Sequence, residues 1–267
     1  MSALGGRSIL LTGASQGIGR ALALELAGRQ ARLMLAARDL PALEQVAAEC
    51  RERGAEARVV RCDVAEQAQC RAAVEAAVQA FGGLDVLVNN AGIGMMARFD
   101  EVADLAPYER VMRVNYLGCV YLTHYALPEL KKSRGRIAVV ASLAGLTGVP
   151  TRTAYAASKH AVFGFFDSLR IELRASGVTV TLLAPDFVVS EIHRRALGPD
   201  GRPLGQSPMQ ESKIMTTEAC AARIARALEA RERLVVMSPR GRVGRFVRLL
   251  FPGLIDRIAE KAVREGR

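Results

Sequence analysis

Short apolar runs alternate with longer helical stretches along most of this 267-residue chain. The runs have the length of buried strands, and the stretches between them are long enough for helices of several turns. This alternation predicts βαβ units, in which a parallel sheet is covered by helices on both faces. The expected strands are residues 8–11, 32–36, 57–61, 86–89, 136–141, 179–183 and 234–237. The expected helices are residues 18–29, 41–53, 66–81, 107–131, 153–175 and 218–230.

The chain length suits one α/β domain with a well-buried core and is short for two. We therefore expect a single doubly wound parallel sheet of about seven strands over residues 1–239, with ligands beyond the carboxyl ends of the strands. Within it, glycines and prolines interrupt residues 185–216, and irregular segments of this length are usually functional or disordered. Residues 240–267 are expected to form a helical C-terminal extension.

A glycine-rich turn, Thr12-Gly-Ala-Ser-Gln-Gly-Ile-Gly19, follows the first expected strand. Gly13, Gly17 and Gly19 let the backbone turn tightly and approach a phosphate, whose charge the amino end of the following helix attracts. A glycine turn alone also occurs as a simple strand-to-helix connection. Its place after the first strand favours nucleotide binding.

Ser142, Tyr155 and Lys159 form a second candidate group. A phenol has a pKa of about 10 and is a poor acid–base catalyst at neutral pH unless a nearby cation favours the phenolate. Residues four apart share one face of a helix, so Lys159 can supply that cation to Tyr155. A hydroxyl from Ser142 could hold a substrate carbonyl beside them.

A Tyr and a Lys four apart also occur by chance on solvated helix faces, so the pair alone is a weak signal. The order of the motifs strengthens it, because the glycine turn, Asn89-Asn-Ala-Gly92 and Asn115 all precede the pair. With these motifs the chain resembles the short-chain dehydrogenase/reductases of the Tyr-x-x-x-Lys type, nearest to their hydroxysteroid-dehydrogenase-like branch. The resemblance extends from residue 6 to about residue 237.

This resemblance implies a Rossmann-type fold and hydride transfer between nicotinamide C4 and a carbonyl or alcohol carbon. Tyr155 would be the acid in reduction and the base in oxidation. Lys159 would assist it and bind the nicotinamide ribose, Ser142 would polarise the carbonyl, and Asn115 would hold a water in a proton relay. The implied catalytic residues are thus Asn115, Ser142, Tyr155 and Lys159.

The end of the second expected strand favours NADP(H) as the cofactor. The acidic residue that binds the ribose hydroxyls of NAD is missing where expected, and Arg38 follows instead. Arg20 is a second guanidinium for the 2′-phosphate. Asp39 could face the ribose, although capping the next helix before Pro41 is a simpler role. The cofactor-binding residues implied by the resemblance are Thr12, Gly13, Ser15, Gln16, Gly17, Ile18, Gly19, Arg20, Arg38, Asp63, Val64, Asn89, Ala91, Gly92, Tyr155, Lys159, Pro185, Val188 and Ser190.

One segment, Pro185-Asp-Phe-Val-Val-Ser190, departs from the family pattern, which usually has Pro-Gly and ends in threonine. Ser190 keeps a hydroxyl for the cofactor. Asp186 in place of glycine adds a side chain and a charge near the nicotinamide, where it can influence substrate choice.

The residues expected at the substrate are mostly apolar and include methionine, which adapts to varied apolar shapes. They indicate a hydrophobic ketone, aldehyde or secondary alcohol, such as a steroid, retinoid or lipid-derived compound. A 3-oxoacyl-carrier-protein reductase is an alternative, and a non-catalytic NADP-binding redox sensor or scaffold is an alternative of another class. The intact catalytic set argues against the sensor. The expected substrate-binding residues are Met95, Ser142, Leu143, Tyr155, Phe187 and Ile192.

The formal net charge of the chain is +10, and residues 240–267 hold eight basic and three acidic residues, a net +5. Apolar residues recur there at helical spacing, and a basic amphipathic helix of this kind can lie on an anionic membrane surface. Packing of the apolar face on the domain, or on a second subunit, is the alternative. The apolar residues are Val243, Phe246, Val247, Leu250 and Leu254.

Several other classes of function are not indicated. The five cysteines form no Cys-x-x-Cys and the three histidines have no ligand-spaced partners, so neither a disulfide framework nor a metal site is expected. No nucleic-acid-binding motif accompanies the positive charge. The N-terminus lacks the apolar core of a signal peptide, so we expect a cytoplasmic protein that can lie at the inner membrane surface through residues 240–267. By analogy with the family, it is expected to be a homodimer or homotetramer.

Overall fold

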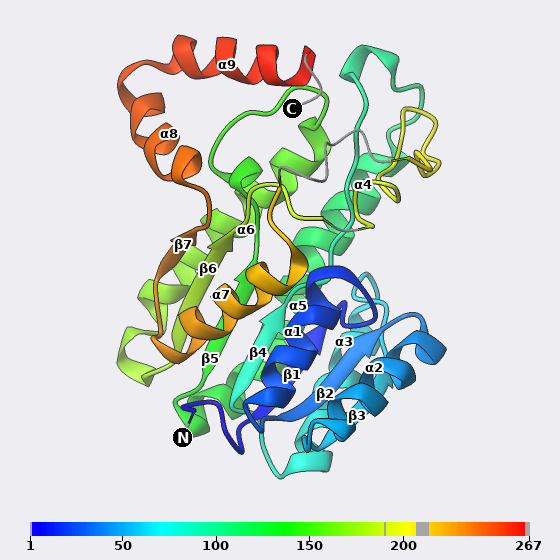
Figure 1. Cartoon of the computed structure of the whole chain (residues 1–267), viewed down its shortest axis with the longest axis vertical. Helices are drawn as coiled ribbons and strands as arrows, with labels where there is room; N and C mark the ends of the chain where they lie inside the picture. Colours follow the sequence, from blue (N-terminus) through cyan, green and yellow to red (C-terminus); the bar gives the residue numbers. More distant parts are fainter. Residues whose placement is uncertain (1, 190, 207–213, 265–267) are drawn as a thin grey trace.

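A computed structural model describes residues 2–189, 191–206 and 214–264, and its core is a seven-stranded parallel sheet (Figure 1). The strand order is β3-β2-β1-β4-β5-β6-β7. The predicted doubly wound sheet is therefore confirmed, and each strand begins at the residue expected from the sequence and ends within one residue of the expected end. The strands are β1 (Ser8–Thr12), β2 (Arg32–Ala37), β3 (Ala57–Arg61), β4 (Val86–Asn89), β5 (Arg136–Val140), β6 (Thr179–Ala184) and β7 (Leu234–Val236).

Two separate apolar cores account for the unbroken apolar character of the central strands. Every residue of β1, β4 and β5 is buried, because helices cover both faces of the sheet. One core packs beneath α1 (Gly17–Gly28), α2 (Leu40–Glu52) and α7 (Thr217–Glu229). The other packs beneath α3 (Gln67–Phe81), α5 (Gly118–Ser133) and α6 (Thr153–Glu172).

The long helix predicted over residues 107–131 is interrupted in the structure. It consists of α4 (Ala106–Met112), a π-helical turn (Arg113–Leu117) and α5. The π-helical turn itself contains no proline or glycine, and the helix continues through Gly118 at the start of α5, so periodicity alone did not reveal the change. A π turn inside an α-helix often marks a functional site, and this one contains Asn115.

The strand order reverses between β1 and β4, so the loops after these two strands meet. Gly13 has a φ of +64°, and a Cβ added to it would lie 2.9 Å from the Cα of Ala91. Nδ2 of Asn90 donates to the carbonyl oxygen of Thr12 at 2.8 Å and joins the loops. Because ligands of doubly wound sheets bind where the strand order reverses, this junction is the expected nucleotide site.

The irregular segment predicted for residues 185–216 lies over the carboxyl ends of the strands. Its described parts contain no helix or strand. An isolated bridge between Val188 and Met215 joins the two ends of the segment, and one between Met95 and Leu197 joins it to the loop after β4. The segment thus brings residues distant in sequence to the edge of the sheet where the nucleotide loops meet.

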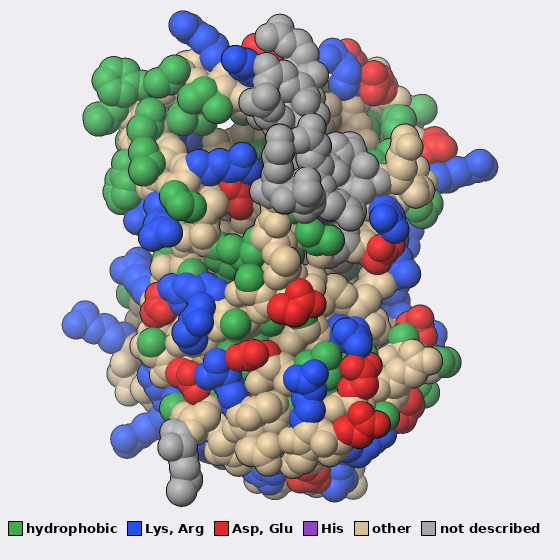
Figure 2. Space-filling view, viewed as in Figure 1, with side chains coloured by type: hydrophobic (Ala, Val, Ile, Leu, Met, Phe, Trp, Pro, Cys, Tyr) green, Lys and Arg blue, Asp and Glu red, His purple; other side chains and the backbone are tan. Residues whose placement is uncertain are grey.

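Two C-terminal helices, α8 (Pro239–Leu250) and α9 (Pro252–Arg264), lie beyond the carboxyl ends of the strands (Figure 1). Their apolar side chains form a patch at the upper left of Figure 2. The alternative in which this face packs on its own domain is not what the structure shows, because these side chains are 48–78% exposed. In the described parts of the chain, no helix has the length and apolar character needed to cross a membrane. The exposed residues are Val243, Phe246, Leu249, Leu250, Phe251, Leu254 and Ile258.

Candidate active site

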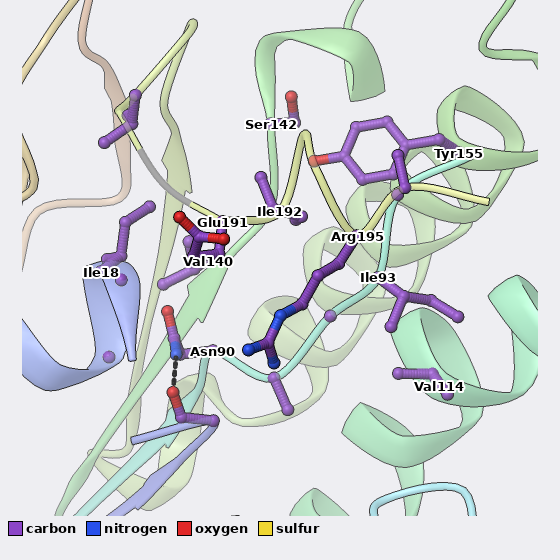
Figure 3. A pocket seen from close by; sticks show the side chains of 18 of the residues that line it. Ile18, Asn90, Ile93, Val114, Val140, Ser142, Tyr155, Glu191, Ile192 and Arg195 are labelled. Atoms are coloured by element: carbon purple, nitrogen blue, oxygen red, sulfur yellow. Dashed lines mark hydrogen bonds between the residues drawn. The ribbon is translucent and has the colours of Figure 1, made fainter. Parts of the chain in front are cut away.

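A cavity of about 630 Å³ opens at the carboxyl ends of the strands and extends from the glycine turn to the start of α6 (Figure 3). Its volume lies in the range of small-molecule and cofactor sites. The structure brings together most of the residues that the sequence predicted for the site. The predicted residues that line it are Gly13, Ser15, Gln16, Gly17, Ile18, Gly19, Arg38, Asp63, Val64, Ala91, Gly92, Met95, Ser142, Leu143, Tyr155, Lys159, Pro185, Phe187, Val188 and Ile192.

The glycine turn places the amino end of α1 at one end of this cavity. Gln16, the N-cap residue, is extended, and its side chain makes no capping hydrogen bond. The first backbone N–H groups of α1 are therefore available to an anion. A Cβ at Gly19 would lie 2.0 Å from the carbonyl oxygen of Gly13, so a side chain there would disrupt the turn. This arrangement fits the diphosphate of a dinucleotide.

Three predicted nucleotide residues do not line the cavity. Thr12 is buried, and its hydroxyl accepts from the backbone N–H groups of Asn90 and Ala91 at 3.0 and 3.1 Å. Asn89 is buried beside Thr123, to which its Nδ2 donates at 3.1 Å. Arg20 pairs with Glu49, as described below. Thr12 and Asn89 therefore lie beneath the site, where their hydrogen bonds hold β4 and the loop that follows it in place.

Asn90, which the sequence analysis did not select, lines the cavity in place of Asn89. The two adjacent asparagines were in the quoted motif, and strand alternation could have separated them. The last residue of a buried strand points into the core, and the next begins the loop.

The two arginines proposed for the 2′-phosphate have different surroundings. Arg38 lines the cavity, and its Nη1 lies 3.9 Å from Oδ2 of Asp63. Arg20 instead forms two hydrogen bonds with Glu49, at 2.9 and 2.7 Å, outside the cavity. Asp39 also lines the cavity, and its Oδ1 caps α2 by accepting from the N–H of Ala42. Of the two arginines, Arg38 is the one placed to meet a nucleotide.

Tyr155, Lys159 and Ser142 face the middle of the cavity. Tyr155 and Lys159 lie on the buried side of α6, and Nζ of Lys159 is 5.6 Å from the centre of the Tyr155 ring. Nζ donates to the carbonyl oxygen of Val140 at 2.9 Å, which fixes the ammonium beneath the site. Figure 3 shows the Tyr155 hydroxyl directed toward Ser142. Ser142 caps the 3₁₀ turn after β5 by accepting from the N–H of Ala144.

Asn115 is fully buried in the π-helical turn next to this group. Its Oδ1 accepts from the N–H of Ile93 at 2.8 Å, and its Nδ2 donates to the carbonyl oxygen of Ile93 and to Ser158 Oγ at 3.0 Å each. Ser158 donates in turn to the carbonyl oxygen of Tyr155 at 2.7 Å. Asn115 thus connects the β4 loop to the helix that carries Tyr155.

Asp186, the departure from the family pattern, forms an ion pair with Arg240 at the start of α8. Nε and Nη2 of Arg240 lie 2.6 and 2.9 Å from the two carboxylate oxygens. The Arg240 guanidinium also lies over the ring of Phe187, 5.6 Å from its centre. The acid therefore ties the C-terminal extension to the loop that lines the substrate end of the cavity.

Four Arg, Glu or His residues at the cavity were not found from the sequence: Arg152, Glu191, His193 and Arg195. Arg195 extends across the cavity toward Asn90 in Figure 3. Most of these residues come from the irregular segment, where no periodicity or motif marks which side chains turn inward. Ser190, predicted to contact the cofactor, lies outside the described residues.

Metal chemistry has no candidate centre in the described parts of the chain, where no cluster of three or more His, Cys, Asp or Glu residues could hold an ion. All five cysteines are buried and unpaired by disulfides.

The comparisons with known proteins agree with this site. A family model described as short chain dehydrogenase matches residues 7–198. An 11-beta-hydroxysteroid dehydrogenase A from Sesamum indicum is 37% identical over 257 residues, covering 94% of this chain and 74% of that protein. A dehydrogenase/reductase SDR family protein 7-like from Dictyostelium discoideum is 33% identical over 259 residues, covering 95% and 80%.

Among solved structures, a short chain dehydrogenase/reductase from Burkholderia phymatum, in complex with NAD, matches with a TM-score of 0.83 and 29% identity. The match covers 95% of this chain and 96% of that chain. Sequence and structure agree over nearly the whole domain, and the resemblance inferred from the motifs is confirmed. The chain belongs to the short-chain dehydrogenase family of oxidoreductases, which bind a nicotinamide cofactor.

Proposed function

We propose that this protein is an NADP-dependent oxidoreductase acting on a hydrophobic ketone, aldehyde or secondary alcohol, of a steroid-, retinoid- or lipid-like class. The observation that carries the proposal is the convergence of Ser142, Tyr155 and Lys159 on one cavity whose far end is the glycine turn. The bound nicotinamide would supply or accept the hydride. The residues of the chain have to position the carbonyl and move a proton.

Each of these tasks has a residue placed for it. The Tyr155 hydroxyl donates the proton to the carbonyl oxygen in reduction and removes it from the alcohol in oxidation. The Ser142 hydroxyl, toward which Tyr155 points, donates a second hydrogen bond to the same oxygen. Lys159 holds its ammonium 5.6 Å from the centre of the Tyr155 ring, where it would bind the nicotinamide ribose. Asn115 keeps the β4 loop and α6 in register through its bonds to Ile93 and Ser158.

NADP is the proposed cofactor because of Arg38. It lines the cavity after β2, 57% exposed, where an NAD enzyme would present an acid to the ribose hydroxyls. A guanidinium forms paired, charge-assisted hydrogen bonds with a phosphate, and its weak pairing with Asp63 at 3.9 Å leaves it available. Asp39 is engaged in capping α2 and does not replace the missing acid.

A hydrophobic substrate is supported by the apolar side chains near Tyr155, among them Met95, Met96, Leu143 and Phe187. The name of the sesame relative is that of a steroid enzyme, which agrees with this class. The ion pair of Asp186 with Arg240 makes the 3-oxoacyl-carrier-protein reductase less favoured. An acidic carrier protein would bind basic residues near the cavity, and the charge of Arg240 is already neutralised by Asp186.

The test is a panel of lipophilic carbonyls and acyl thioesters with NADPH and with NADH, followed by absorbance of the reduced cofactor. We expect turnover of lipophilic carbonyls with a preference for NADPH. Turnover of acyl thioesters alone would favour the carrier-protein reductase. Binding of NADPH with no turnover across the panel would favour the redox sensor or scaffold.

We further propose that residues 240–267 form a separate extension that contacts an anionic membrane surface. Its apolar patch is exposed, and the basic residues of α8 and α9 accompany it. Each basic residue near such a surface contributes about 1 kcal/mol, which salt weakens. The full-length protein should sediment with anionic vesicles at low salt and be released at high salt, and a chain ending at Ser238 should not sediment. If the full-length protein never sediments and the truncation changes the oligomeric mass instead, the patch is a subunit interface of the expected dimer or tetramer.

A further inference from the structure

The substrate end of the cavity contains a cation, Arg152, that has no neutralising partner among the described residues. Arg152 immediately precedes α6, three residues before Tyr155, and lines the cavity. Its Nη2 lies 3.7 Å from the sulfur of Met96, and its Cζ lies 5.2 Å from the centre of the Phe187 ring. Among the described residues, no Asp or Glu lies within ion-pair distance of its guanidinium.

This position is costly for a guanidinium. Arg152 is partly buried, so it has lost part of its hydration, and a thioether sulfur is only a weak acceptor. Burial lowers the pKa of Arg152, whereas a carboxylate partner would raise it. The sulfur and the ring hold the side chain in place but leave most of its five N–H donors without an acceptor in the described chain.

His193 is a second polar group with an unused bonding position at the same end. It is 6% exposed, lines the cavity, and its ring centre lies 6.1 Å from that of Phe187. It hydrogen-bonds to the backbone of Val188, and its Nε2 has no partner among the described residues. Burial and the charge of Arg152 lower the pKa of His193 to about 4, so the ring is neutral at pH 7 and an arriving anion would favour its protonation.

Arg240 provides an internal contrast. It lies beside the same Phe187 ring, and the chain supplies it with the Asp186 carboxylate in a two-hydrogen-bond pair. Two guanidinium groups therefore lie beside one ring, and among the described residues only Arg240 has a carboxylate partner. Of the two guanidinium groups beside Phe187, the one without a described carboxylate is that of Arg152, three residues before Tyr155.

We propose that Arg152 and His193 bind an acid group of the substrate, which is therefore a lipophilic carbonyl compound that carries a carboxylate. The planar guanidinium donates two hydrogen bonds to the carboxylate, and the protonated His193 donates one from Nε2. Met96, Val149 and Phe187 contact the carbon skeleton between the acid and the carbonyl. The reduction of such a substrate rests on the proposed function. The binding of its carboxylate by Arg152 and His193 does not.

The kinetic test compares oxo acids with their methyl esters, which have the same reacting carbonyl and no charge. The probes are 6-oxohexanoate, 9-oxononanoate and 12-oxododecanoate, each beside its ester. Arg152→Met should lower kcat/KM for the preferred acid by about 10- to 100-fold and for its ester by less than about threefold. Arg152→Lys should retain part of the preference for the acid, and His193→Gln should lose about three- to tenfold.

Arg195→Met is the matched control, because it removes a cation from the same cavity at the end near Asn90. This variant should change kcat/KM for the acid and for its ester by the same factor. The inference is overturned if the wild-type enzyme treats acids and esters equally, if Arg152→Met lowers both to the same extent, or if Arg195→Met removes the preference instead.

A binding measurement separates this inference from the proposed reaction. Calorimetry with NADP⁺-loaded protein should show decanoate binding to the wild type, at least about tenfold weaker binding to Arg152→Met, and no comparable difference for 1-decanol. If no carbonyl is reduced but this difference is found, the proposed function fails and the acid site stands. If decanoate binds equally to both proteins, or to neither, the acid site is wrong whatever the activity.

Discussion

The two ends of the cavity are built in different ways. At the nucleotide end, the loops after β1 and β4 are held together by short hydrogen bonds, such as those of Thr12 and Asn90, and their side chains come from compact motifs. At the substrate end, the side chains come from three separate segments, which contribute Arg152, then Asp186 with His193, and then Arg240. Among the described residues, Arg152 has no carboxylate partner and Nε2 of His193 has no partner. The first end fits the nicotinamide cofactor that the family binds, whereas the second is assembled from residues far apart in the sequence.

The largest effect we expect is at the residue between the two ends. Tyr155→Phe removes the hydroxyl that donates the proton and should lower kcat by at least about 100-fold, because a positioned acid contributes about 10²- to 10⁴-fold. NADPH affinity, measured by calorimetry, should change by less than about threefold. Turnover close to that of the wild type would show that the Tyr155 hydroxyl is not the proton donor.

A second prediction concerns the nucleotide end alone. Arg38→Asp should shift the ratio of NADPH to NADH affinity by about 10- to 100-fold toward NADH, because a charge-assisted hydrogen bond to the 2′-phosphate is lost and an acid can accept from the ribose hydroxyls. Arg20→Asp is the matched control. Arg20 pairs with Glu49 outside the cavity, so its change should be several-fold smaller. A larger change in this affinity ratio for Arg20→Asp than for Arg38→Asp would show that Arg20, not Arg38, binds the 2′-phosphate.

The ion pair between Asp186 and Arg240 tests whether the C-terminal extension supports the substrate end. Asp186→Asn, Arg240→Gln and the double variant form a cycle, which should give a coupling of about 0.5–1 kcal/mol in unfolding, since the Arg240 side chain is 62% exposed. Each single variant should raise KM for the carbonyl a few-fold and leave KM for NADPH unchanged. If KM for the carbonyl and KM for NADPH changed equally, the ion pair would stabilise the whole domain rather than the substrate end alone.

The smallest expected effect is the pH dependence of stability contributed by His193. Its pKa is lowered to about 4 in the folded chain, below the ordinary value of 6.5, so the unfolded state binds more protons between these values. Its contribution is fully present above about pH 6.5 and is lost as the pH falls toward 4. His193→Gln should therefore show a smaller decrease in Tm across this window than the wild type. Parallel profiles would indicate that His193 is not buried as a neutral ring.

Most residues predicted for the nucleotide end and the catalytic group line one cavity, because each set depends on local rules. A buried parallel strand, a glycine turn with positive φ at Gly13, and a Tyr and Lys on one helix face are all visible within a few residues. The π-helical turn at Asn115 was not predicted, because residues 113–117 contain no proline or glycine and the helix continues through Gly118. It forms where Asn115 can bond to both backbone groups of Ile93.

The substrate end was less predictable for a physical reason. Whether Arg152 has a counter-ion depends on where Asp186 and Arg240 lie, and they are 34 and 88 positions away along the chain. The role of Asp186 in particular could be read only from the structure. The sequence marked it as a departure near the nicotinamide, and the structure shows it paired with the C-terminal extension.

The most direct test of the account follows a deuterium atom from the cofactor to the substrate. The wild-type protein is incubated with NADPH deuterated on either face of C4 and a lipophilic aldehyde or ketone that it turns over, and the alcohol is analysed by mass spectrometry. The account predicts one deuterium on the former carbonyl carbon from only one of the two labelled cofactors, and no labelled alcohol with Tyr155→Phe. An alcohol without deuterium from either cofactor, or equal yields from the wild type and Tyr155→Phe, would contradict the proposed hydride transfer.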